Sequence, residues 1–403
     1  MLEIRPILSA LLRNRTGALL VGVQVAITLA VIANAFFIIE GRLEKIRRPT
    51  GVDSANLIVA ESEGYASDYQ HAATLAADLA LLKAVPGVVA VTPTNSVPLS
   101  GGGSANAYQL TPDPKATPIG GNYFEVNSDF IEAFGLKLVT GRNFRPEEYV
   151  PVPPTNDLPP VVIVTETMAK TLFGAEPALG RRIYDNDGKS AEIVGIVSDM
   201  HGSWLDNTRP GPYDVVFHPN GGFGKTWRYA IRVRPGERDR LIPEIEKRLN
   251  SGGHGRAVPW VRAHDYWLVR TFRADRRMVV FLSTLVILMT AVTALGIVGL
   301  ATFHVNARRK QIGTRRALGA RRADIVRYFL LENAMLGAGG VVIGALLAYG
   351  ASSWLTSAFQ MPPLPARYVL LSALALLVLG QLAVLWPARR AGAIEPAVAT
   401  RTV

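Results

Sequence analysis

The densest cluster of charged side chains lies between Arg308 and Arg327, where eight basic residues and one acidic residue, Asp324, occupy twenty positions. Guanidinium and ammonium groups bind phosphate oxygens and carboxylates. The cluster lies between two long apolar runs, and short basic loops beside membrane spans stay on the cytoplasmic side. It therefore predicts a cytoplasmic segment that contacts lipid phosphates or acidic groups of a partner.

A glycine-rich segment is similar to a phosphate-binding loop but does not complete the pattern. Pro219 stands where the first glycine belongs, and the segment ends in Gly224-Lys225-Thr226. Such a loop must lead into a helix, because N–H groups at the helix N-terminus hold the phosphates. Residues 227–234 instead alternate apolar and polar side chains, which predicts a strand. We therefore interpret the segment as a hairpin turn.

No set of residues has the spacing of a catalytic or metal site. The chain has no cysteine, which excludes disulfides and thiolate ligands. His264-Asp265 and the pair Asp199 and His201 are the nearest approach to acid–base pairs, but hydrogen-bonding or surface roles are expected for them. The six histidines show no His-x-x-x-His pairing: His71, His201, His218, His254, His264 and His304. We expect no enzyme activity, metal or cofactor in this chain.

The net charge of +11 comes from three segments. Residues 1–16, 304–330 and 388–403 account for all of it, whereas residues 40–277 carry 28 basic and 28 acidic side chains. A nucleic-acid-binding domain would itself be basic. Basic segments beside apolar runs instead follow the positive-inside rule. The charge pattern therefore predicts a membrane protein and no nucleic-acid partner.

Four uncharged runs are long enough to cross a bilayer. They are residues 17–39, 278–303, 333–359 and 368–386, with 23, 26, 27 and 19 residues. About 20 helical residues cross the roughly 30 Å of hydrocarbon. A signal peptide is the alternative for the first run, because Ala33-Asn34-Ala35 is similar to a cleavage site. The run continues past that point through Ile39, which favours a span.

The charge bias orients these spans with both chain ends in the cytoplasm. The predicted fold class is a membrane protein of four transmembrane helices, with a large extracytoplasmic α/β (α+β) domain of two lobes between the first and second spans. The predicted segments are a cytoplasmic N-terminus at 1–16, spans at 17–39, 278–303, 331–359 and 368–387, an external domain at 40–277, a cytoplasmic loop at 304–330, an external turn at 360–367 and a cytoplasmic tail at 388–403.

The external domain alternates strand and helix patterns. Residues 55–60, 68–84 and 87–92 predict a β-α-β unit, and helical character between Glu40 and Arg48 ends at Pro49. Further strands are predicted at 122–126, 161–164, 191–197 and 227–234, and helices from a Ser128 cap through Phe134, at 166–173 before Gly174, and at 237–249. Five prolines within residues 151–160 predict a loop or subdomain boundary.

The spans contain no ionisable side chain, since Glu332 lies only at the edge of the third. Ion-coupled carriers usually keep such a group in the membrane. The polar residues present are neutral and predict hydrogen bonds between helices: Gln24, Asn34, Thr290, Thr293 and Gln381. Gly340 and Gly344 form a small-x-x-x-small pattern, which predicts close helix packing or dimerisation.

The basic loop also resembles the signature of FtsX-like permeases of the MacB type. The residues that carry the resemblance are Arg308-Arg309-Lys310-Gln311-Ile312-Gly313, Arg315-Arg316-Ala317-Leu318-Gly319-Ala320, Asp324-Ile325, Phe329-Leu330-Leu331-Glu332 and the tail Pro387-Ala388-Arg389-Arg390-Ala391 with Glu395-Pro396. The external domain is similar to a MacB periplasmic core at Val85-Pro86-Gly87-Val88, Phe134-Gly135-Leu136, Gly141-Arg142-Asn143-Phe144, Leu172-Phe173-Gly174 and Val194-Gly195-Ile196-Val197.

The resemblance implies a non-catalytic permease subunit of an ABC transporter in the bacterial inner membrane. It implies a cytoplasmic ATPase dimer that binds ATP and Mg, a second copy or paralogue of the permease, and membrane lipids around the spans. A periplasmic adaptor is a further partner that the resemblance suggests. It also implies that the loop after the second span is a coupling helix that docks on the ATPase. The corresponding residues here are Arg308, Arg309, Ile312, Gly313, Arg315, Arg316, Leu318, Gly319, Asp324 and Ile325.

An apolar side of this segment is predicted at Ile312, Leu318, Ile325, Val326 and Phe329. Unlike MacB, the chain shows no fused ATPase domain, so the nucleotide site is expected on another chain. The first functional hypothesis is export of a hydrophobic or peptide-like substrate by mechanotransmission. The alternatives are an FtsX-like regulator that activates an extracytoplasmic enzyme without transport, and a membrane-anchored enzyme or sensor without an ATPase.

Overall fold

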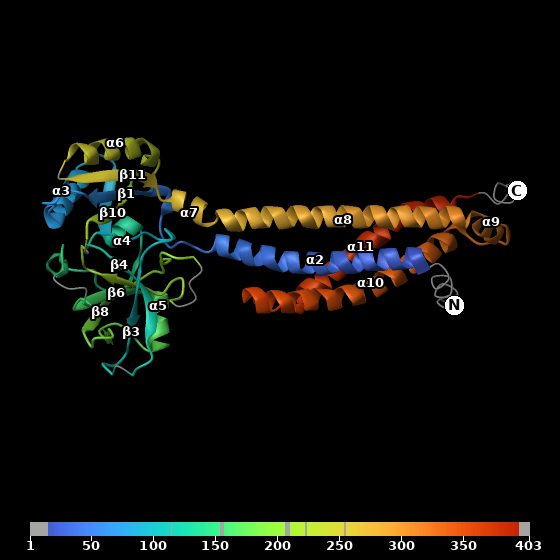
Figure 1. Ribbon diagram of the computed structural model, residues 1–403, viewed down its shortest axis with the longest axis horizontal. Helices are drawn as coiled ribbons and strands as arrows, with labels where there is room; N and C mark the ends of the chain where they lie inside the picture. The colour runs from blue at the N-terminus through green and yellow to red at the C-terminus, as the bar shows by residue number, and fades with distance from the viewer. Residues whose placement is uncertain are drawn as a thin grey trace. The chain divides into compact units, whose positions relative to one another are not determined.

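The protein divides into a helical unit and an α/β unit. The computed structural model describes residues 15–113, 115–153, 157–205, 210–221, 224–253 and 255–394. The α/β unit is Arg48–Arg273, and the helical unit comprises the described residues before and after it (Figure 1). The predicted N-terminal segment before residue 15 and the tail from Glu395 onward lie outside the described residues.

The helical unit contains four helices that are long and apolar enough to cross a membrane. They are α2 (Arg15–Arg47), α8 (Arg273–Ala307), α10 (Arg322–Phe359) and α11 (Ala366–Gly392), and the short helix α9 (Arg309–Ala317) lies between α8 and α10. Each long helix contains one of the uncharged runs of the sequence. The predicted fold class is confirmed, and α2 ends just before Pro49 as expected.

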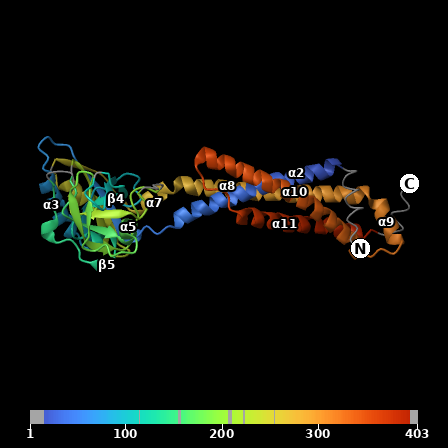
Figure 2. The same ribbon diagram turned by 90° about the horizontal axis from the view of Figure 1, so that it is seen from below.

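Glycines allow α10 to lie directly against α2. A Cβ atom on Gly340 would come within 2.9 Å of the Gly22 carbonyl oxygen, and one on Gly344 within 2.8 Å of the Ala26 carbonyl oxygen. Figure 2 shows the two helices from a second direction. The predicted close packing at Gly340 and Gly344 therefore joins two helices of the same chain.

Three of the neutral polar residues form the predicted bonds between helices. Gln24 Nε2 donates to the carbonyl of Val292 (3.0 Å), and Asn34 Nδ2 donates to the carbonyl of Ala348 (3.1 Å). The hydroxyls of Thr28 and Thr293 lie 2.8 Å apart. The prediction was wrong for Thr290, whose hydroxyl donates to the Val286 carbonyl of its own helix. A Thr hydroxyl in an apolar helix reaches the carbonyl four residues earlier without any neighbouring helix.

The first sheet of the α/β unit has the strand order β11-β1-β10-β2. These strands are β1 (Leu57–Gly64), β2 (Val88–Thr94), β10 (Thr226–Val233) and β11 (Arg256–Ala263), and the helices that pack with them are α3 (His71–Lys83) and α6 (Arg238–Ser251). Both β1 and β2 run antiparallel to β10, which lies between them. The predicted β-α-β unit is therefore present, but a strand distant in sequence splits it.

The second sheet has the order β3-β4-β9-β6-β8-β5, with β7 paired to β8. Its strands are β3 (Ser104–Tyr108), β4 (Ile119–Glu125), β5 (Leu138–Gly141), β6 (Val161–Thr165), β7 (Arg182–Tyr184), β8 (Ser190–Val197) and β9 (Val215–His218). Helix α5 (Glu166–Phe173) ends at Gly174 as predicted. Helix α4 (Phe130–Phe134) begins after Asp129 without a side-chain cap, so the predicted Ser128 cap was wrong.

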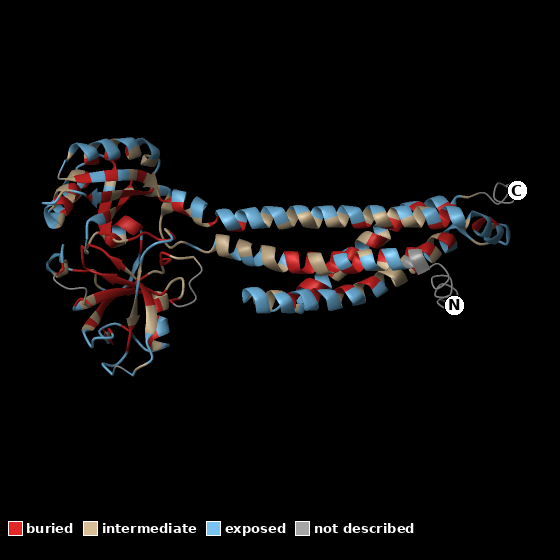
Figure 3. Cartoon of the chain, viewed as in Figure 1, coloured by how far each residue is buried: buried red, intermediate tan, exposed pale blue. Residues whose placement is uncertain are grey.

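Burial follows the strand pattern predicted for β10. Trp227, Tyr229, Ile231 and Val233 are all buried in one apolar cluster with residues of α3 and α6. Buried residues are concentrated along the sheets of the α/β unit, whereas much of α8 is exposed (Figure 3). Alternation along the chain therefore identified which face of this strand is covered.

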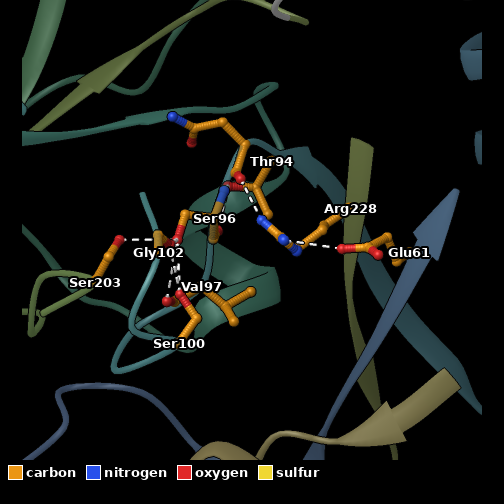
Figure 4. Close-up of polar contacts among 9 residues, drawn as sticks. Glu61, Thr94, Ser96, Val97, Ser100, Gly102, Ser203 and Arg228 are labelled. Atoms are coloured by element: carbon orange, nitrogen blue, oxygen red, sulfur yellow. Dashed lines mark hydrogen bonds and ion pairs between the residues drawn. The ribbon is translucent and has the colours of Figure 1, made fainter. Parts of the chain in front are cut away.

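Polar contacts around the loop after β2 join the two sheets (Figure 4). Arg228 on β10 donates through Nη1 to the carbonyl of Asn95 (2.7 Å), and its Nη2 lies 2.8 Å from Glu61 Oε2 on β1. The hydroxyls of Ser96 and Ser203 lie 2.8 Å apart, and Ser203 belongs to the loop that precedes β9. The Arg228 contacts are partly exposed and the Ser96–Ser203 contact is buried, and together they tie both sheets to one loop.

Candidate functional site

The strongest candidate site is the segment that connects α8 to α10. Helix α9 ends in a turn in which Gly319 has φ +98°, a backbone conformation that favours glycine. The Ala320 amide donates to the Arg315 carbonyl (3.0 Å), which is the hydrogen bond that closes a helix at a left-handed glycine. Asp324 Oδ2 then accepts a bond from the Arg321 amide (2.9 Å) at the start of α10. These residues shape the turn.

One side of α9 is held in the core of the helical unit. Ile312 is 5% exposed and belongs to an apolar cluster that includes Val305 of α8, Ile325 and Phe329 of α10 and Ala388 of α11. The predicted apolar side is thus confirmed at Ile312, Ile325 and Phe329. Because the cluster draws on three other helices, α9 is packed into the helical unit and is not a free loop.

Leu318 does not belong to that buried side, and the prediction that it does was wrong. Its side chain is 83% exposed. The physical reason is helical spacing, since six residues at about 100° each place Leu318 roughly 120° around the helix axis from Ile312, off the buried side.

Three arginines of the segment are engaged within the helical unit. Arg308 Nη1 lies 3.1 Å from Glu332 Oε2 and 3.2 Å from the Tyr328 hydroxyl. The guanidinium of Arg315 lies over the Tyr328 ring, 5.2 Å from its centroid. Arg316 Nη1 donates to the Ala320 carbonyl (3.3 Å). These side chains fix α9 against α10.

The other side of α9 is exposed, and among the described residues its side chains make no ion pair or ring contact with another helix. We call it the α9 face and define it by four exposed residues: Lys310, Gln311, Thr314 and Leu318. Arg309 is also exposed, at the start of the helix. The coupling residues predicted from the sequence did not include Lys310, Gln311 or Thr314. The signal was available, because Lys310, Thr314 and Leu318 follow one another at intervals of four residues, which places them on one side of a helix.

The other candidates have structural roles. A strand, β10, follows residues 219–226 as expected, but the prediction of a hairpin turn was wrong, because the flanking strands β9 and β10 belong to different sheets. Gly222, Phe223 and His254 lie outside the described residues. His264 Nε2 lies 3.0 Å from the Pro98 carbonyl oxygen, and burial lowers the pKa of His264 to about 4. Asp265 pairs with Arg238 (2.9 Å) rather than with His264. This histidine is therefore a hydrogen-bonding residue, as predicted.

The described residues contain no group of three or more His, Cys, Asp or Glu placed to hold a metal ion. The described part of the α/β unit contains one ion pair whose two side chains are both almost completely buried. Arg256 Nη2 lies 2.5 Å from Asp78 Oδ1, and both side chains are almost completely buried. The Tyr229 hydroxyl donates to the other oxygen of Asp78 (2.8 Å). This group joins β10, β11 and α3 and is a core ion pair.

Two family models match the chain. Residues 19–248 match the MacB-like periplasmic core domain, and residues 283–396 match the FtsX-like permease C-terminal model. The second match contains the whole of α9 and the α9 face.

Curated relatives are distant and longer. The chain is 26% identical over 279 residues to the macrolide export ATP-binding/permease protein MacB of Chromobacterium violaceum, with 67% of this chain and 42% of that protein covered. It is 24% identical over 230 residues to the MacB protein of Aggregatibacter actinomycetemcomitans, with 56% of this chain and 35% of that protein covered. The chain therefore spans less than half the length of these relatives.

Solved structures are similar to part of the chain. The periplasmic region of MacB from Actinobacillus actinomycetemcomitans is 15% identical and covers 55% of this chain and 95% of its own, with a TM-score of 0.36. The extracellular domain of the transporter YknZ from Gram-positive bacteria is 17% identical and covers 50% and 98%, with a TM-score of 0.31. The family models and the sheets described above carry the assignment of the fold.

Proposed function

This chain belongs to the FtsX-like ABC transporter permeases with a MacB-like periplasmic core domain. We propose that an ATPase binds the α9 face and that ATP hydrolysis there drives movement of this chain. The ATPase acts from outside the 403 residues of this sequence and binds the ATP and Mg. The chain itself supplies the spans and the external domain. It acts as a non-catalytic subunit or part of the transporter.

The observation that carries this proposal is the two-sided environment of α9. Ile312 and Gly313 are buried in the helical unit, while Lys310 and Leu318 are exposed on the other side. A short helix that is anchored on one side and free on the other can transmit a push to the helices that hold it. Here those helices are α8, α10 and α11, which share the apolar cluster around Ile312.

The basic charge supports a cytoplasmic position for the α9 face. The twenty residues from Arg308 carry eight basic side chains and one acidic side chain, and such loops remain in the cytoplasm. The chain ends then lie on the same side and the α/β unit lies outside the cell membrane. The bacterial inner membrane is the location that fits this topology. Lipid phosphates are further partners for the arginines that flank α9.

We propose that movement of the α/β unit expels a hydrophobic or peptide-like substrate from the external side. The curated relatives are named for macrolide export, which favours export over regulation. Glu332 is the ionisable residue nearest the middle of α10 and it pairs with Arg308, so it does not serve as an ion-coupling carboxylate. In this proposal the ATPase drives the movement of the α/β unit mechanically, and a wide aqueous channel between the spans is not needed.

A second copy or a paralogue is proposed to complete the membrane part. Helix α8 leaves many large apolar side chains exposed along its length, including Phe281, Ile287 and Leu295. Within a bilayer these side chains face lipid or another helix. A periplasmic adaptor on the α/β unit is a further proposed partner.

The test is purification of the tagged chain from its native membrane. The proposal predicts that an ABC ATPase copurifies in stoichiometric amount and that the complex hydrolyses ATP in lipid vesicles. Transport of a substrate into or out of those vesicles separates export from regulation, because a regulator hydrolyses ATP without moving a substrate. A native complex without any ATP-binding subunit would overturn the proposal.

A further inference from the structure

The α/β unit contains a polar pocket of about 240 Å³ that the proposed function does not use. Its wall includes Tyr123 and Glu125 of β4 and His218 at the end of β9. Asp157 and Asp187 also line it, and no lysine or arginine is among the described residues that line it. A pocket with carboxylates and without cations selects a positively charged ligand.

Glu125 is the buried charge of this pocket. It is 6% exposed, and neither carboxyl oxygen has a hydrogen bond or ion pair among the described residues. The recorded bond of this residue is made by its backbone amide, which donates to Asn95 Oδ1 (3.1 Å). Burial raises the pKa of Glu125 to about 7. At such a depth the ionised carboxyl group is stabilised when water or a cationic group of a ligand in the pocket pairs with it.

Asp185 in the same wall is already engaged. Its Oδ1 accepts bonds from the amides of Asp187 (3.0 Å) and Lys189 (2.8 Å), so it shapes the turn between β7 and β8. Asp157 Oδ2 lies 3.8 Å from the ammonium of Lys189. These carboxylates therefore have partners, whereas the deeper Glu125 does not.

The remaining wall is aromatic and uncharged. The His218 ring stacks on Tyr123 with ring centroids 4.8 Å apart and an angle of 8° between the planes. The Tyr108 hydroxyl lies 3.1 Å from His218 Nε2. Burial lowers the pKa of His218 to about 3, so the imidazole is neutral and does not repel a cation. A stacked, electron-rich pair of this kind suits an organic cation.

We propose that this pocket binds the protonated amine of a small organic ligand, with the Glu125 carboxylate as its counter-ion and the Tyr123 and His218 rings as its apolar wall. An ammonium group needs one counter-ion and a few hydrogen-bond acceptors, which Glu125 and the polar side chains of this pocket supply. Calcium takes six to eight oxygen ligands, and no group of three metal-binding side chains is present in the described residues. The site belongs to the external domain and is independent of the α9 face.

The affinity of the pocket for an amine should depend on pH. Glu125 must be ionised, and its pKa near 7 makes amine binding stronger as the pH rises from about 6 to about 8. The other titratable groups around it are the carboxylates Asp157, Asp185 and Asp187 together with His218 and Tyr149. Burial lowers the pKa of His218 to about 3 and raises the pKa of Tyr149, so both are neutral over that range. The change in affinity therefore reports the titration of Glu125.

The test is calorimetric titration of the full chain in detergent with n-butylammonium chloride, n-butanol and calcium chloride at about pH 8. The expected result is that butylammonium binds, butanol does not, and Glu125→Gln weakens butylammonium binding by about tenfold or more. Glu132→Gln is the matched control, because Glu132 is exposed in the same unit, and it should bind as the wild type does.

Several outcomes would overturn the proposal. These are equal binding of butanol, unchanged binding of butylammonium to Glu125→Gln, the absence of any butylammonium binding, or calcium binding that Glu125→Gln abolishes. Glu125→Asp keeps the charge and should retain binding, which separates loss of the carboxylate from a general change in the pocket. Thermal unfolding of each variant verifies that it is folded.

Discussion

Arg308 Nη1 lies 3.1 Å from Glu332 Oε2, so an ion pair joins the residue before α9 to the interior side of α10. The Glu332 side chain is almost completely buried, and Arg308 also contacts the Tyr328 hydroxyl. This relationship gives the edge carboxylate of the third apolar run a structural role. It also fixes the start of α9 relative to the helix that follows it.

Arg308→Ala should destabilise the helical unit. Removal of one partner from a buried ion pair costs about 3 kcal/mol, because Glu332 would remain buried without a counter-charge. Arg309→Ala is the matched control, since Arg309 is the exposed neighbour of the same residue type. Thermal unfolding in detergent measures the difference. Equal melting temperatures for the two variants would show that the ion pair contributes nothing.

Gly344→Ala should separate α10 from α2. The new Cβ would lie 2.8 Å from the Ala26 carbonyl oxygen and 2.9 Å from its Cα, and backbone atoms cannot move away as a flexible side chain can. A cost of about 1 to 3 kcal/mol is expected from such overpacking. Gly350→Ala is the control on the same helix, because a Cβ there meets nothing within 4 Å. The prediction fails if Gly350→Ala is the more destabilising of the two.

The pattern of residue types along the chain predicted those parts of the fold that depend on residues close in sequence. The four apolar runs, the alternation of β10 and the Gly174 end of α5 all follow from spacing and residue type. The position of β10 between β1 and β2 could not be predicted in this way. It depends on a pairing between Ile231 and Val91 that spans most of the α/β unit.

The candidate site also has features that the sequence predicted and features that it did not. The sequence placed the basic segment and its buried Ile312 correctly, because a helix with apolar residues on one side packs that side inward. Leu318 was placed on the wrong side because its apolar character was given more weight than its helical position. Glu125 was missed entirely. Nothing in the residues around it reveals that strands β4 and β9 bury its carboxyl group beside His218.

Glu125→Gln should change the stability of the chain in a pH-dependent way. The folded state raises the pKa of Glu125 to about 7, so it holds the proton more tightly than the unfolded state does. The contribution of this carboxyl group to stability therefore falls as the pH rises from about 4.5 to about 7 and remains low above that. In an amine-free buffer, Glu125→Gln should gain on the order of 3 kcal/mol over the wild type at about pH 8.

Near pH 4 the same substitution should have little effect, because the wild-type carboxyl group is then neutral in both states. Unfolding in denaturant at both pH values provides the measurement, with Glu132→Gln as the control that should show no such difference. A loss of stability for Glu125→Gln at both pH values would mean that the ionised carboxylate has a stabilising partner.

The role of the α9 face is tested most directly by the affinity of the ATPase for variants of this chain. The measurement is titration of the copurified ATPase against the purified chain in lipid nanodiscs. Lys310→Glu combined with Leu318→Glu should weaken binding by about tenfold or more, since both side chains are exposed and removed from the core. Arg276→Glu, an exposed charge reversal near the other end of α8, should bind as the wild type does. Equal affinity of the ATPase for all three proteins would contradict the account.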